Sequence, residues 1–78
     1  MNSENSKIEV STINADDKVI ESTWNSVEDF LEDWYSDDCS APMLDDTLEY
    51  AKVCGKEVKG EHFIDVVRYL EQMTGMKL

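Results

Sequence analysis

Apolar and polar residues alternate over the first four positions of residues 8–13, and most residues of this segment are β-branched or apolar. The pattern predicts a β-strand. Residues 14–17 (Asn-Ala-Asp-Asp) predict a turn, and residues 18–24 predict a returning strand. We expect this β-hairpin to face the core through Ile8, Val10, Ile20 and Trp24. Two strands are only marginally stable alone, so the hairpin needs helices packed against it.

Helix signals begin at Ser26, which is followed three residues later by Asp29 in the short-side-chain form of a capping box. The apolar residues then recur at helical spacing and share one face: Val27, Phe30, Leu31 and Trp34. We therefore expect a helix that begins at Ser26 and ends near residues 36–38.

A second helix is expected after residues 40–42 (Ser-Ala-Pro), because serine caps a helix and proline is tolerated in the first turn. Its shared face would contain Leu44, Thr47, Leu48 and Ala51, joined one turn later by Val53 or Cys54. Gly55 is a typical helix stop. Residues 56–60 predict a short connection, in which Val58 could also pair briefly as a strand.

The last segment, residues 61–74, predicts a third helix that Gly75 ends. Its apolar stripe contains Phe63, Val66, Val67, Leu70 and Met73. Together the segments predict an α+β fold in which an N-terminal β-hairpin packs against about three α-helices. We expect residues 1–7 to be a flexible N-terminus and residues 8–78 to form a single small globular domain.

Composition excludes several classes of function. The 78 residues include 18 acidic and 7 basic side chains and carry a formal net charge of −11. The chain itself is therefore not expected to bind nucleic acid or an anionic membrane surface, which have the same sign of charge. No apolar run approaches the length of a membrane span, and the polar start is not a secretion signal, so we expect a cytoplasmic protein.

Residues that could carry catalysis or bind a metal are sparse. His62 is the only imidazole and has no serine or cysteine nearby as a nucleophile, and the chain has no phosphate-binding or dinucleotide motif. Cys39, Cys54 and His62 lack a fourth zinc ligand, and the aspartate doublets lack the alternate spacing of a calcium loop. We expect no enzyme, no cofactor and no metal, and we expect the two cysteines to be free thiols.

Negative charge is concentrated in one part of the chain. Residues 16–49 contain twelve acidic residues and one lysine, which accounts for the whole net charge of −11. In the first expected helix, Glu28/Glu32 and Asp29/Asp33 are both spaced i, i+4, so each pair projects from one side. Like-charged pairs at this spacing cost about 0.2–0.5 kcal/mol each. Stability alone would favour interleaved lysines.

We therefore predict that this acidic segment binds a basic groove on another protein, where carboxylates take the place of nucleic-acid phosphates. An aromatic anchor is expected beside the charges, because charge alone raises association rate more than affinity. The candidate partner-binding residues are Glu28, Asp29, Glu32, Asp33, Tyr35, Asp37, Asp38, Asp45, Asp46 and Glu49. The alternative is that the acidic surface only aids solubility and that Tyr35 is half-buried in a structural role.

The short length, the acidic doublets and the hairpin followed by a capped helix (residues 23–35, TWNSVEDFLEDWY) resemble a broad group of small acidic inhibitors. These are encoded by phages and mobile elements and include anti-CRISPR and anti-restriction proteins. The resemblance covers about half of the chain. Because the group contains many unrelated folds, the resemblance assigns no role to individual residues. It implies a stoichiometric inhibitor that occupies a nucleic-acid site on a nuclease complex in the host cytoplasm.

Other functions stay open at the level of sequence. One is a general interaction or adaptor domain that uses a hydrophobic groove between helices. Another is an immunity or antitoxin-type protein, which also uses acidic surfaces against basic nucleases. Self-association into a homodimer through leftover apolar surface is a third.

Overall fold

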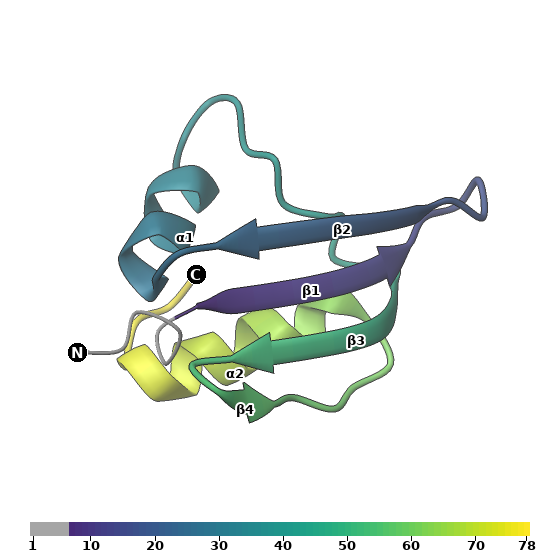
Figure 1. The fold of residues 1–78 in the computed structure, drawn as a ribbon. Helices are drawn as coiled ribbons and strands as arrows, with labels where there is room; N and C mark the ends of the chain where they lie inside the picture. The colour runs from purple at the N-terminus through teal and green to yellow at the C-terminus, as the bar shows by residue number, and fades with distance from the viewer. Residues whose placement is uncertain (1–6) are drawn as a thin grey trace.

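Four antiparallel strands and two helices make up the part of the chain that the computed structural model describes, residues 7–78. The elements are β1 (Ile8–Ile13), β2 (Val19–Trp24), α1 (Val27–Trp34), β3 (Thr47–Val53), β4 (Lys56–Glu57) and α2 (Phe63–Thr74). The strand order is β2-β1-β3-β4. Helix α2 crosses one face of the sheet, and α1 lies at the end of β2 (Figure 1). The expected flexible N-terminus falls, over residues 1–6, outside the described residues.

The predicted N-terminal hairpin is confirmed. Strands β1 and β2 pair from Ile8 opposite Trp24 to Ile13 opposite Val19. In the turn, the side-chain oxygen of Asn14 accepts hydrogen bonds from the backbone amides of residues 16 and 18, at 2.9 and 3.1 Å. Three of the four expected core residues are buried, and Ile20 is half-buried. The turn and the alternation therefore set the register of the hairpin.

Helix α1 confirms the expected helix, although it ends at Trp34 rather than near residues 36–38. The Ser26 hydroxyl accepts a hydrogen bond from the backbone amide of Asp29 at 3.1 Å, as the capping pattern predicts. Phe30 is buried, and its ring meets Trp24 edge to face with centroids 4.8 Å apart. The ring of Trp34 stacks on Phe30 with centroids 5.7 Å apart. This aromatic cluster attaches α1 to the end of β2.

The prediction of a second helix after residues 40–42 is wrong. Residues Thr47–Val53 instead form β3, which pairs antiparallel with β1. Opposite Ser11 stands Tyr50, whereas opposite the next residue of β1 stands Leu48, so the register shifts by one residue at a β-bulge. The bulge turns Leu48 and Ala51, three residues apart, toward the same buried face. That spacing is the spacing of one helical turn, and it produced the false helical pattern.

Gly55 ends no helix but forms the tight turn between β3 and β4. Its neighbour Cys54 has a φ of 53° and Gly55 a φ of 84°. Two successive left-handed residues are what a two-residue hairpin turn requires. Val58 extends the pairing, since its amide donates to the Ala51 carbonyl at 2.9 Å. The short strand anticipated in residues 56–60 is therefore present.

Helix α2 closes the core and matches the predicted third helix. It begins after the N-cap His62 and ends at Gly75, whose φ is 73°. Its buried residues Phe63, Val66, Val67 and Leu70 pack with the buried residues of the sheet in one hydrophobic cluster. Met73, expected on the same stripe, is instead exposed. The fold is thus α+β with an N-terminal hairpin, and the described residues contain two helices rather than about three.

Candidate protein-binding surface

The predicted site residues separate into two groups. One group lies on α1 and in the connection that follows it: Glu28, Asp29, Glu32, Asp33, Tyr35, Asp37 and Asp38. The other lies just before β3 and within it: Asp45, Asp46 and Glu49. Asp45 and Asp46 line a hollow together with residues 14 and 15 of the β1–β2 turn. Strand β2 separates that turn from α1 by about 20 Å, at roughly 3.3 Å per residue.

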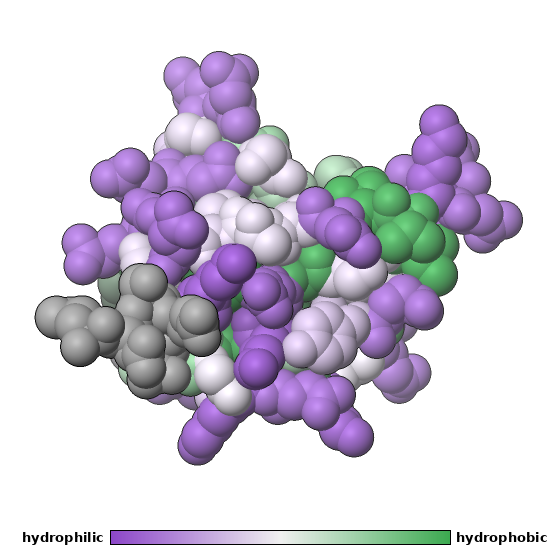
Figure 2. All heavy atoms as spheres, viewed as in Figure 1, coloured by the Kyte–Doolittle hydropathy of each residue, from purple (hydrophilic) through white to green (hydrophobic). Residues whose placement is uncertain are grey.

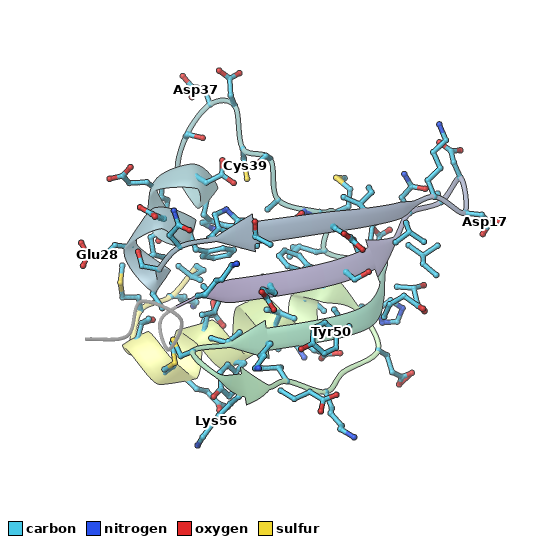
Figure 3. All side chains as sticks on the ribbon, viewed as in Figure 1. Asp17, Glu28, Asp37, Cys39, Tyr50 and Lys56 are labelled. Carbon is cyan, nitrogen blue, oxygen red and sulfur yellow. The ribbon has the colours of Figure 1, made fainter. Side chains whose placement is uncertain are left out.

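Figure 3 shows the same separation. Asp17 projects from the tip of the hairpin, Glu28 from the start of α1 and Asp37 from the connection, each in a different direction. The acidic segment therefore forms no single continuous face. A docking surface must be sought within one of the two groups.

Asp33 is half-buried and bonded to other segments of the fold. Its carboxylate accepts hydrogen bonds from the Trp24 indole at 3.2 Å, from the Ser40 hydroxyl at 2.9 Å and from the Ser40 backbone amide at 3.2 Å. Desolvation acts to raise the pKa of Asp33, but these hydrogen bonds outweigh it, and the pKa lies below its ordinary value of 3.8. This side chain fastens the connection to α1 and to β2, and a partner would have to compete with three donors.

Asp46 is likewise occupied within the fold. It is buried, with 7% of its surface exposed, and its carboxylate accepts from the Met43 amide at 3.3 Å. Its backbone carbonyl accepts from the Phe63 amide at 3.0 Å, which joins the start of β3 to the start of α2. We therefore assign Asp46 a structural role as well.

The other acidic residues of the first group are exposed: Glu28, Asp29, Glu32, Asp37 and Asp38. Within residues 7–78 the one ion pair joins Lys7 to Glu9 at 3.5 Å, so none of these carboxylates is neutralised by a described basic side chain. Tyr35 is 60% exposed, and its amide donates to the Leu31 carbonyl at the end of α1.

A shallow hollow of about 410 Å³ lies on the exposed flank of α1, lined by Glu28, Leu31, Glu32 and Tyr35. The two carboxylates are one helical turn apart, and so are the leucine and the tyrosine. Leu31 is half-buried. This arrangement combines uncompensated negative charge with an apolar floor, and it can take a cationic side chain of another protein. The sequence predicted three of these residues as partner-binding, whereas Leu31 was expected in the core with the rest of the apolar stripe of α1.

The residues considered for other chemistry lie apart. His62 caps α2, Cys39 is exposed in the connection, and Cys54 is half-buried at the β3–β4 turn; both cysteines are free. Over the described range 7–78, no group of three or more histidine, cysteine, aspartate or glutamate side chains is placed to hold a metal. Tyr50, on the uncovered face of the sheet, was not among the predicted site residues, because the sequence pattern placed it in a helix.

No family model matches the chain, and neither the curated proteins nor the solved structures contain a significant match. Neither described helix is long and apolar enough to cross a membrane.

Proposed function

We propose that the protein is a non-enzymatic inhibitor that binds a basic nucleic-acid-binding surface of another protein, such as a nuclease or a CRISPR-type complex. The contact is made by α1 and the connection after it. The observation that carries the proposal is the flank of α1, where Glu28 and Glu32 stand without ion-pair partners among the described residues, beside Leu31 and Tyr35.

The charge density along α1 supports phosphate mimicry. Glu28, Asp29 and Glu32 lie within five residues, which is about 7.5 Å of helix axis at 1.5 Å per residue. That gives one charge per roughly 2.5 Å, compared with one per roughly 1.7 Å along duplex DNA. Such a field steers a basic partner over a Debye length of about 8 Å at physiological salt. Leu31 and Tyr35 then supply the apolar contact that charge lacks.

Charge reversal on α1 tests the proposal. The variant Glu28→Lys with Glu32→Lys leaves Asp33 untouched, because losing that residue would disturb the connection. The matched control is Glu57→Lys with Glu61→Lys, which makes the same change of charge at exposed positions away from α1. Inhibition of DNA cleavage is measured against a panel of restriction and CRISPR-type nuclease complexes.

For a nuclease that the parent protein inhibits, we expect the α1 variant to bind at least about 100-fold more weakly than the parent. The reason is that like charges brought together at an interface cost several kcal/mol. The control should inhibit like the parent protein. Affinity of the parent should fall steeply between about 50 mM and about 200 mM salt. Equal losses in the two variants, or an affinity that is the same at both salt concentrations, would refute the mechanism.

A further inference from the structure

The face of the sheet opposite α2 carries a second hollow. Figure 1 shows α2 behind the sheet, so the near face is open, and Figure 2 shows that this face is mostly polar with an apolar area toward the β1–β2 turn. Across its middle, Ser11 of β1 stands opposite Glu21 of β2 on one side and opposite Tyr50 of β3 on the other. Directly opposed side chains lie about 4.5–5.5 Å apart at their Cβ atoms.

The small serine leaves space between its two larger neighbours. The resulting hollow has a volume of about 240 Å³ and is also lined by Glu9 and Thr23. Tyr50 is 43% exposed and lies on the open side of β3 (Figure 3). The hollow therefore has an aromatic wall, hydroxyl groups at its floor and rim, and two carboxylates.

The two carboxylates differ in whether they form an ion pair. Glu9 already forms an ion pair with Lys7 at 3.5 Å. Glu21 is exposed and has no ion-pair partner within residues 7–78. The hollow thus keeps one uncompensated negative charge facing an aromatic ring across a small residue. Lys52 of β3 also stands opposite Glu9, so the uncompensated charge of the hollow lies at Glu21, where a cation gains from both the carboxylate and the aromatic ring.

We propose that this hollow binds the guanidinium group of an arginine side chain from a partner protein. The planar guanidinium stacks on the Tyr50 ring, while its N–H groups donate to the Glu21 carboxylate and to the Ser11 hydroxyl. Arginine fits better than lysine, because a rigid planar fork can stack and bond at once whereas an ammonium is a strongly hydrated point charge. The site lies on the sheet and not on α1, so it goes beyond the proposed function and is tested separately from it.

The test is a titration of the whole protein followed by its amide NMR signals. The probes are a capped Gly-Arg-Gly peptide and the same peptide with citrulline, which is the neutral counterpart of arginine. We expect the arginine peptide to shift the signals of Ser11, Glu21 and Tyr50, and the citrulline peptide to leave them in place. Tyr50→Ala and Glu21→Gln should each weaken binding about threefold.

The matched control is Glu61→Gln, which removes an exposed carboxylate that lines neither hollow. It should bind the arginine peptide like the parent protein. Equal shifts with citrulline, or unchanged binding by Tyr50→Ala and Glu21→Gln, would overturn the site. So would shifts confined to α1 and lost in Glu28→Gln, although that result would leave the proposed function standing. Conversely, the arginine peptide could shift only signals of the sheet while charge reversal on α1 leaves nuclease inhibition unchanged. That pair of results would overturn the proposed function and leave the arginine site standing.

Discussion

Three aspartate side chains, those of Asp33, Asp46 and Asp65, accept hydrogen bonds from backbone amides within the fold. The Asp33 carboxylate joins separate segments, the Asp65 carboxylate fixes the start of α2, and the Asp46 carboxylate closes a local turn with Met43. Asp33 differs from the other two because it also accepts from the hydroxyl of Ser40 and the indole of Trp24. A carboxylate with several donors loses more on substitution than a solvated one, because the donors are then left without a partner.

We predict that Asp33→Ala destabilises the protein at neutral pH and that the loss shrinks in acid. The pKa of Asp33 in the folded protein lies below its ordinary value of 3.8, so folding favours the ionised form. The contribution of the ionised side chain to the free energy of unfolding is therefore complete above the ordinary pKa. It is lost as the pH falls through the lower pKa of the folded protein. Urea unfolding of parent and variant at a series of pH values measures the difference.

Asp38→Ala is the control for this prediction, because Asp38 is an exposed residue of the same connection. Its stability should match that of the parent at neutral pH, since surface substitutions usually change stability little. A loss in Asp33→Ala that equals that of the control, or that is the same at all pH values, would contradict the structural role given to Asp33.

Sequence could not separate these aspartates from the exposed ones. Asp29 and Asp33 are both predicted to face outward one turn apart, but only Asp33 meets donors from other segments, seven and nine residues distant. Local spacing contains no information about where the Ser40 connection returns. Counting acids therefore predicts a charged surface and does not tell which carboxylates are available to a partner.

At the scale of elements, local signals predicted most of the fold. The hairpin, α1 and α2 follow from alternation, capping residues and an apolar stripe that each lie within the element itself. The prediction for residues 47–53 was wrong because the bulge in β3 depends on pairing with β1, which is distant in sequence. The spacing of Leu48 and Ala51 fits a helix and a bulged strand equally well. Alternation over residues 48–50 (Leu-Glu-Tyr) and again over residues 51–53 (Ala-Lys-Val) was the weaker signal that favoured the strand.

The start of α2 allows a prediction at this scale. A Cβ added to Gly60 would overlap the Asp65 side chain and lie 2.7 Å from Oδ2. That oxygen accepts from the amides of Glu61 and His62 at 2.8 and 3.2 Å, and these two bonds lower the pKa of Asp65 and fix the first turn. We expect Gly60→Ala to cost about 1–3 kcal/mol, as overpacking does. Thermal or urea unfolding measures the loss.

Gly75→Ala provides the comparison at the other end of α2. A Cβ there would meet nothing within 4 Å, so only the φ of 73° penalises alanine, at about 1–2 kcal/mol. In the Gly60 variant the amide signals of residues 61 and 62 should also move, whereas in the Gly75 variant they should not. If Gly60→Ala left both the stability and these signals unchanged, the Asp65 carboxylate would not organise the start of α2.

At the scale of the whole molecule, the charge is distributed unequally between the elements. Residues 50–78, which contain β4 and α2, carry five basic and four acidic side chains, while residues 16–49 carry the full charge of −11. The fold does not compensate this imbalance. The one ion pair among the described residues joins Lys7 to Glu9, and neither residue lies in the acidic segment 16–49. Repulsion within α1 therefore persists in the folded protein.

This repulsion leads to a prediction about stability. Glu32→Gln should raise the free energy of unfolding by about 0.2–0.5 kcal/mol, because it removes the like-charged i, i+4 contact with Glu28. Glu32 also stands in the last turn of α1, where the helix dipole disfavours negative charge. The gain should shrink at high salt, which screens both effects. Urea unfolding at low and high ionic strength measures it, with Glu57→Gln as a control outside α1.

The same variant separates a functional acidic surface from a structural one. If the Glu32 carboxylate serves a partner, Glu32→Gln stabilises the free protein and weakens its binding to a basic nuclease, so the two measurements move in opposite directions. If the variant instead loses stability, the carboxylate contributes to folding, and the acidic flank of α1 has an explanation that requires no partner. A gain in stability with unchanged binding would place the contact outside Glu32, and the hollow beside Leu31 and Tyr35 would no longer support the proposed function.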